Sequence, residues 1–278
     1  MEHVRLIVDS SSNCLPDEER DLHVVPLTVS FGSENVLDDS RLDLSAFLEK
    51  MDNNTEPGKT AAPSIQRWLD ALEGSERAII MTITSGMSGT YSSALQAKDI
   101  YLENHPTAEV IVVDSRSAGP ELAVVLEAIE KMIQDKDLRF VDLEAKIAEY
   151  RTKTHLLFVL QSLHNLSLNG RVSPAVAKIA GMLKINLIGD ASKEGTLEQL
   201  SKARGMKRAL REVVNQMKKK GYQGGRVIID ECENASDAEK LKEQIIEEFP
   251  DADVSIRQTR ALCSFYAERG GLMIGFHD

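Results

Sequence analysis

Short apolar runs of strand length alternate along the first half of the chain with amphipathic segments of helical period. We expect strands at Arg5–Asp9, Val24–Phe31, Ala78–Thr84 and Glu109–Asp114. We expect helices between them, at Leu44–Met51, Ile65–Leu72, Gly89–Glu103 and Glu121–Gln134. The run Ala78–Thr84 (AIIMTIT) is almost entirely apolar, which is typical of a parallel strand covered by helices on both faces. The alternation therefore predicts an α/β protein with a doubly wound sheet.

The pattern changes after a further predicted helix at Val141–Tyr150. Strands are expected at His155–Leu160, Ile185–Ile188, Arg226–Asp230, Asp253–Arg257 and Leu272–Phe276. Helices are expected at Pro174–Leu183, Met206–Lys219 and Asp237–Phe249. We place a domain boundary near residue 153, giving domains 1–153 and 154–278. No low-complexity linker separates the two, so we expect them to pack closely.

Composition limits the classes of function. The chain has 278 residues and a net charge of -11, which disfavours non-specific binding to nucleic acid or to an anionic membrane. No window approaches the ~18 apolar residues of a transmembrane helix. Three cysteines lie far apart without a CxxC pair, and six histidines show no metal-ligand spacing. We therefore expect a soluble cytoplasmic protein with reduced thiols, no metal and no transmembrane segment.

The segment from Thr84 to Thr90 (TSGMSGT) follows the most apolar strand and precedes a helix. Ligands of open α/β sheets bind beyond the carboxyl ends of the strands, so this loop is a candidate site. Ser88 and Thr90 supply hydroxyls, while Gly89 and the helix start allow the backbone to approach an anion. Alternatively, Ser88 or Thr90 only caps the helix. The residues alone do not separate these two interpretations.

Two more specific interpretations of this loop are excluded, because its sequence does not match the motif that each requires. A phosphate-binding P-loop needs a lysine after its last glycine, and Thr90 follows Gly89 here. A hydrolase nucleophile elbow needs G-x-S-x-G, whereas Gly89 follows Ser88 immediately. No catalytic residue is therefore assigned.

Two further segments carry polar residues in loops. Lys59–Ser64 (KTAAPS) places Thr60 before a helix, where it either enters a cleft or belongs to an ordinary entry loop. Arg171 follows Gly170, and a planar guanidinium can pair both oxygens of a carboxylate or phosphate. On residue statistics alone, an exposed surface arginine is the commoner case. Polar residues that end other strands or accompany the Ser88 loop are candidates to lie nearby: Asp9, Ser10, Ser85 and Ser115.

These segments, in this order, resemble the DegV family. The resemblance rests on IVDSSS at the first strand end, Lys-Thr-x-x-Pro-Ser, Ser-Gly-Thr-Tyr, Val-Asp-Ser, and Gly-Arg-Val-Ser before an Ala-rich helix. It extends over essentially the whole chain. It implies a DegV-like fold (EDD fold) of two α/β domains, an N-terminal α/β/α domain with a parallel sheet and a C-terminal domain with a mixed sheet. It also implies a long-chain, palmitate-like fatty acid bound in a tunnel between the domains.

The resemblance further implies roles for named residues. Thr60 and Ser88 would hydrogen-bond the fatty acid carboxylate, and Arg171 would lie at the head group or partner side. Some family members are the acyl-carrying subunit of bacterial fatty acid kinase, in which a separate ATP-binding subunit phosphorylates the carboxylate. This chain would then be a lipid-binding, non-catalytic subunit.

The chain departs from the family at two places. Ala61 and Ala62 replace polar residues that many members carry after the threonine. A C-terminal histidine of many members is absent from the segment that begins at Tyr266, and Tyr266 and Arg269 are the candidates to replace it. Three alternatives therefore remain open: a lipid-binding or regulatory protein with no kinase partner, a phosphate-binding transferase and, least favoured, a serine hydrolase.

Overall fold

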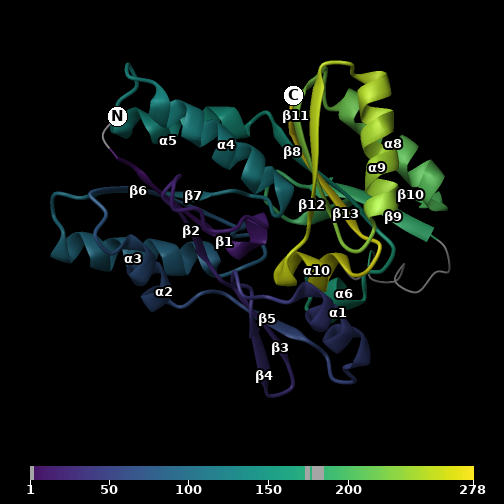
Figure 1. Ribbon diagram of the computed structural model, residues 1–278, viewed down its shortest axis with the longest axis horizontal. Helices are drawn as coiled ribbons and strands as arrows, with labels where there is room; N and C mark the ends of the chain where they lie inside the picture. Colours follow the sequence, from purple (N-terminus) through teal and green to yellow (C-terminus); the bar gives the residue numbers. More distant parts are fainter. Residues whose placement is uncertain (1–2, 173–175, 177–184) are drawn as a thin grey trace.

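The computed structural model describes residues 3–172, 176 and 185–278. Within these residues the strands form three sheets, of four, six and three strands. Figure 1 shows the first two sheets side by side, with helices around them and the three-stranded sheet below. The fold is therefore α/β, with one parallel and one mixed sheet, as expected.

The four-stranded sheet is parallel, with strand order β2-β1-β6-β7. Its strands are β1 (Arg5–Asp9), β2 (Leu22–Val25), β6 (Arg77–Thr82) and β7 (Glu109–Asp114). The helices on its two faces are α2 (Ile65–Leu72) and α3 (Thr90–Asn104) on one, and α4 (Pro120–Gln134) and α5 (Phe140–Arg151) on the other.

Strand β6 illustrates why this region reads as a continuous apolar run. Ala78 and Ile80 pack against α2 and α3, while Ile79 and Met81 pack against α4 and α5. Successive side chains of a strand point to opposite faces, so a sheet covered on both faces needs apolar residues at every position.

The six-stranded sheet is mixed, with strand order β10-β9-β8-β13-β11-β12. Only β11 and β12 are parallel neighbours among its described strands, and the other pairs are antiparallel. The strands are β8 (Thr154–Leu160), β9 (Ile185–Ala191), β10 (Leu197–Arg204), β11 (Gly225–Glu231), β12 (Ala252–Gln258) and β13 (Leu272–His277). Helices α8 (Met206–Lys219) and α9 (Ala235–Glu248) cover one face. Helix α5 ends and β8 begins next to residue 153, where the change of sheet occurs.

The small sheet has order β4-β3-β5 and lies with three helices against the other face of the mixed sheet. Its strands are β3 (Thr28–Phe31), β4 (Glu34–Leu37) and β5 (Lys59–Ala61), and the helices are α1 (Leu44–Asn53), α6 (His164–Leu168) and α10 (Ala261–Ala267). Residues of β3, β4 and the three helices share one apolar cluster with Phe158 and Leu160 of β8. This cluster surrounds the cavity described below.

Helix α4 packs against both large sheets. Leu122, Val125 and related residues join the cluster of the parallel sheet, whereas Ala123 and Val124 contact Ile228 of β11. The start of the helix comes so close to β13 at Gly275 that a Cβ there would collide with the backbone of Pro120. A single helix therefore joins the two sheets.

The structure corrects several expected elements. The predicted strand Val24–Phe31 is two strands, β2 and β3, in different sheets. Pro26 lies between them and has no N–H for a ladder, so the chain leaves the parallel sheet there. Strands β4, β5 and β10 and helices α6 and α10 were not anticipated. The helix expected at Pro174–Leu183 lies, apart from residue 176, outside the described residues.

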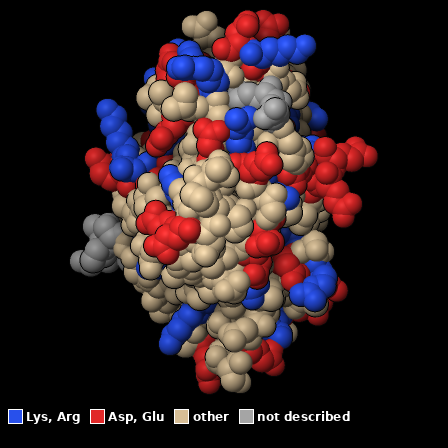
Figure 2. Space-filling view, turned by 90° about the vertical axis from the view of Figure 1, so that its left-hand side faces the viewer, with Lys and Arg blue, Asp and Glu red and all other residues tan. Residues whose placement is uncertain are grey.

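The surface carries charges of both signs. Figure 2 shows acidic and basic side chains interspersed over one face, around an area of uncharged residues. None of the helices in the described ranges combines the length and apolar character needed to cross a membrane.

Candidate functional site

An apolar cavity of about 250 Å³ lies where the two large sheets and the small sheet meet. Its walls come from the loops after β2, β6 and β7, from β5, β8, β10 and β13, and from α6 and α10. Its lining residues are Leu27, Thr60, Ala61, Ala62, Ile83, Met87, Ser88, Gly89, Ala118, Phe158, Leu160, Leu166, Arg171, Leu197, Leu262, Cys263, Tyr266, Ala267 and Met273.

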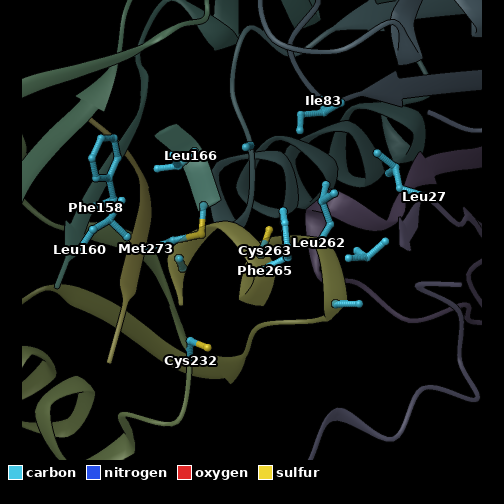
Figure 3. Packing of buried hydrophobic residues seen from close by; sticks show 14 of the residues in the cluster. Leu27, Ile83, Phe158, Leu160, Leu166, Cys232, Leu262, Cys263, Phe265 and Met273 are labelled. Atoms are coloured by element: carbon cyan, nitrogen blue, oxygen red, sulfur yellow. The ribbon is translucent and has the colours of Figure 1, made fainter. Parts of the chain in front are cut away.

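Most of the wall is hydrocarbon, sulfur or aromatic ring. Figure 3 shows Phe158, Leu160, Leu166 and Met273 on one side, Leu27 and Ile83 on the other, and Leu262 and Cys263 of α10 between them. The ring of Phe158 occupies the space over Gly189, where a Cβ would meet it. A cavity of this composition suits a long apolar ligand.

Thr60 lies in β5, paired with Val29 of β3, and faces the cavity. Its Oγ1 is 2.7 Å from the Oη of Tyr266 in the last turn of α10. Burial raises the pKa of the Tyr266 phenol, and the Thr60 hydrogen bond and the charge of Arg171 lower it in part. Tyr266, Thr60 and Arg171 therefore lie at the same region of the wall.

Ser88 lies in the loop between β6 and α3 and also faces the cavity. Its Oγ is 2.7 Å from Thr90 Oγ1 and accepts a hydrogen bond of 3.3 Å from Thr90 N. Ser88 thus stabilises the start of α3 and at the same time contributes to the wall. The two interpretations of this loop are compatible.

Arg171 follows α6 and is the one charged residue among the described residues of the wall. Its Nη1 donates to the carbonyl of Asn169 at 2.8 Å, and no carboxylate pairs with it in the part of the chain that the structure describes. Asn169 in turn donates to the carbonyl of Gly58, two residues before Thr60. This bond ties the arginine loop to the strand that carries Thr60.

The remaining predicted residues differ in position. Gly89 lines the cavity, and Thr90 is buried directly behind Ser88. Asp9, Ser10 and Ser115 are buried behind the wall and are not among its lining residues.

Three of these predicted residues hold parts of the wall in place. Asp9 Oδ2 accepts from Ile83 N at 2.6 Å, and Ser10 Oγ accepts from Leu27 N at 3.0 Å. Ser85 Oγ donates to Asp114 at 2.6 Å, which fixes the Ser88 loop to the end of β7. Burial raises the pKa of the Asp9 carboxyl to about 6.

Sequence reasoning missed the residues that hold α10. The carboxylate of Asp38, which is buried, accepts from Ala261 N at 2.9 Å and from Leu262 N at 3.0 Å. Asn165 of α6 donates to the carbonyl of Phe265 at 2.8 Å. Both contacts join segments at least 100 residues apart, so no local pattern signals them. Their effect is to position Tyr266.

The two residues considered as replacements for the family histidine differ in where their side chains lie. Tyr266 lines the cavity and contacts Thr60. Arg269 instead forms ion pairs with Asp52, at 2.7 Å, and with Glu233. Tyr266 is therefore the one that reaches the site.

The polar groups of the cavity do not form a recognisable catalytic set. The hydroxyl partner of Ser88 is Thr90, and the described residues of the wall include no histidine or carboxylate. Across the described ranges, no three His, Cys, Asp or Glu residues are grouped so that they could hold a metal ion. The arrangement suits an apolar chain that ends in a hydrogen-bonded, anionic head group.

Fold and cavity together define an α/β protein with a largely apolar candidate binding cavity. A family model described as an uncharacterised protein of the DegV family matches residues 3–277, and the chain belongs to this family. Among curated relatives, a DegV domain-containing protein of Streptococcus pneumoniae strain R6 is 42% identical over 252 residues, which are 91% of this chain and 89% of the relative.

Two solved structures are similar over 99% of both chains. One is a DegV family protein from Eubacterium eligens loaded with heptadecanoic acid, with a TM-score of 0.95 and 39% identity. The other is the Streptococcus pneumoniae Fatty Acid Kinase (Fak) B3 protein loaded with linoleic acid, with a TM-score of 0.94 and 40% identity.

Proposed function

We propose that this protein binds one long-chain fatty acid, with the tail in the apolar cavity and the carboxylate at Thr60, Ser88 and Arg171. The observation that carries the proposal is the composition of the cavity wall. An apolar lining meets three hydroxyls and one arginine that has no carboxylate partner among the described residues. The fatty acids named for the two similar structures support the same ligand class.

The physical balance favours such a ligand. A sixteen-carbon tail that leaves water contributes about 0.8 kcal/mol per methylene, or about 10 kcal/mol before the costs of association. The carboxylate must keep its hydrogen bonds, because an unpaired buried charge costs several kcal/mol. Thr60, Ser88 and Arg171 meet that requirement. Tail burial supplies the affinity, and the head-group contacts fix the orientation.

We further propose that the protein is a non-catalytic carrier that presents the carboxylate to a separate ATP-binding kinase subunit. The similarity to the Fatty Acid Kinase (Fak) B3 protein supports this role. The sequence has no P-loop, so the phosphoryl group would come from ATP held by the partner. In this arrangement Arg171 would neutralise charge at the head group. We place the protein in the cytoplasm, where such a kinase meets ATP.

The same proposal assigns the lipid site to the junction of two domains divided near residue 153. The division coincides with the passage from α5 to β8 and so from the parallel to the mixed sheet. The cavity takes residues from both sides of that point, for example Ile83 and Met273.

Mass spectrometry of lipid extracted from the purified protein tests the ligand. We expect long-chain fatty acids in a ratio near one per chain. After delipidation, Ser88→Ala should weaken palmitate binding about tenfold, because one charge-assisted hydrogen bond is lost. Ser92→Ala, in an exposed position of α3 just after that loop, is the matched control. Wild-type affinity in Ser88→Ala would contradict the head-group assignment.

Trapping with hydroxylamine tests the carrier role, because it converts an acyl phosphate to a hydroxamate. The loaded protein with ATP and Mg²⁺ should give none. Addition of the ATP-binding subunit of a bacterial fatty acid kinase should give product. If the protein alone forms hydroxamate, it is itself a kinase and the carrier proposal fails.

A further inference from the structure

Each of the two hydroxyls assigned to the carboxylate is paired with a second hydroxyl. Thr60 Oγ1 lies 2.7 Å from Tyr266 Oη, and Ser88 Oγ lies 2.7 Å from Thr90 Oγ1. A hydroxyl has one hydrogen and two lone pairs, so each pair uses one hydrogen and leaves the other free. Which hydrogen is left free decides what the cavity offers to a ligand.

In the second pair, burial decides the direction. Thr90 is fully buried, and within the described residues its Oγ1 has no hydrogen-bond partner except Ser88 Oγ. A buried hydroxyl hydrogen without an acceptor is unfavourable, so Thr90 donates to Ser88. Ser88 Oγ also accepts from Thr90 N, which occupies its second lone pair. Ser88 is left with only its hydrogen to offer to the cavity.

In the first pair, acidity decides the direction. A phenol is more acidic than an aliphatic alcohol and is the stronger hydrogen-bond donor. In the described part of the chain, Tyr266 Oη has no acceptor other than Thr60 Oγ1. Tyr266 therefore donates, and the hydrogen of Thr60 remains free. Burial raises the pKa of Tyr266, which keeps the phenol protonated and able to donate.

We propose that Tyr266 and Thr90 are positioning residues that turn the hydrogens of Thr60 and Ser88 toward the cavity, so that the site favours anionic head groups that accept both hydrogens. A carboxylate or an acyl phosphate meets this condition, because neither has a hydrogen of its own at neutral pH. A fatty alcohol meets it less well, because it has no charge to strengthen the two hydrogen bonds and because both lone pairs of Ser88 Oγ are already occupied. The inference rests on the proposed function and specifies how the head group is selected.

A comparison of two ligands with the same tail tests the inference. Palmitate and 1-hexadecanol, delivered from cyclodextrin to the delipidated protein, differ only in the head group. Tyr266→Phe keeps the ring against Phe265, at a centroid distance of 5.0 Å, and removes only the hydroxyl. We expect it to weaken palmitate binding about fivefold to tenfold and to leave 1-hexadecanol binding within twofold. Tyr150→Phe, a phenol outside the cavity wall, is the control.

A double mutant separates positioning from direct contact. If Tyr266 acts through Thr60, Tyr266→Phe should change palmitate affinity less than twofold in a Thr60→Val background. In the second pair, Thr90→Val should weaken palmitate binding as Tyr266→Phe does. Thr90→Ser, which keeps the hydroxyl, should restore the affinity. If Thr90→Val does not fold, the Tyr266 series still decides the question.

The outcomes are distinguishable. Equal weakening of both ligands by Tyr266→Phe would assign the hydroxyl a packing role and overturn the inference. Full additivity in the Thr60→Val background would overturn it as well, because Tyr266 would then act independently of Thr60. Neither result affects the proposed function as long as the wild-type protein binds palmitate. Failure of the wild-type protein to bind palmitate would overturn both.

Discussion

Removal of the Asp38 carboxylate should destabilise the protein strongly, because that group holds the start of α10. Asp38→Ala leaves two backbone N–H groups, of Ala261 and Leu262, without their acceptors at a buried position. An unsatisfied buried donor costs about 1–3 kcal/mol, so the pair corresponds to about 4 kcal/mol. Asp38→Asn keeps one acceptor oxygen and should cost about half as much.

Asp43 provides a matched control. It also caps a helix, because its carboxylate accepts from Ala46 N at 3.0 Å at the start of α1, but that bond is exposed to solvent. Asp43→Ala should therefore cost about 1 kcal/mol, the usual value for an exposed cap. The expected difference between the two alanine variants is about 3 kcal/mol.

Urea unfolding of the delipidated proteins measures this difference. The fluorescence of Trp68, the single tryptophan of the chain, reports unfolding of the core around α2. The midpoint should fall far more in Asp38→Ala than in Asp43→Ala, with a similar slope in both. The reasoning is refuted if the two variants are equally stable. Asp38→Ala should also weaken palmitate binding, since α10 positions Tyr266.

Three further predictions concern the core and the cavity. Burial raises the pKa of Asp9 from 3.8 to about 6, so the folded protein retains the proton over that interval while the unfolded chain releases it. Stability should therefore fall by about 2 kcal/mol between pH 4 and pH 6, and urea titrations of Asp9→Asn should show a smaller slope over that interval. Ala118→Leu adds three carbons to the cavity wall and should displace about three ligand methylenes. This displacement corresponds to about fiftyfold weaker palmitate binding. An unchanged palmitate affinity in a titration would place the tail elsewhere. Burial raises the pKa of the Cys232 thiol and raises that of the Cys263 thiol further. Ellman's reagent should therefore label only the partly exposed Cys14 before the protein unfolds. Rapid labelling of all three thiols would contradict the packing of α10.

The parallel sheet could be predicted from the sequence because its strands are apolar on both faces. The predicted limits of β1 and β7 agree with the structure. The merging of β2 and β3 was an error that Pro26 could have prevented. Strand β10 was missed because its sequence lacks an apolar-polar alternation. Its side chains alternate in exposure, but Gln199 and Ser201 lie on the more covered side and Leu200 lies on the exposed side.

The surroundings of α10 could not be predicted, because their interactions are not local. Helix α10 has seven residues, too few to show a clear helical period in the sequence, and no neighbouring side chain caps it. Its cap comes instead from Asp38, 223 residues earlier. Thr60, Ser88 and Arg171, which the family resemblance assigned to the head group, line one cavity. Their contact with a carboxylate stays a prediction. The hydroxyl partners of Thr60 and Ser88 emerge only from the three-dimensional arrangement.

Helix α4 determines how the chain can be divided experimentally. A fragment that stops near residue 153 would keep the parallel sheet but lose β11 and β13, against which Val124 and the start of the helix pack. It would also lose Thr154, whose hydroxyl donates to the buried Glu121 carboxylate at 2.7 Å. Such a fragment would expose to water an apolar helix face and a carboxylate that keeps the hydroxyl of Ser117 but has lost that of Thr154. The two halves should therefore melt together in calorimetry, as one transition, and separately expressed halves should aggregate unless they are produced in the same cell.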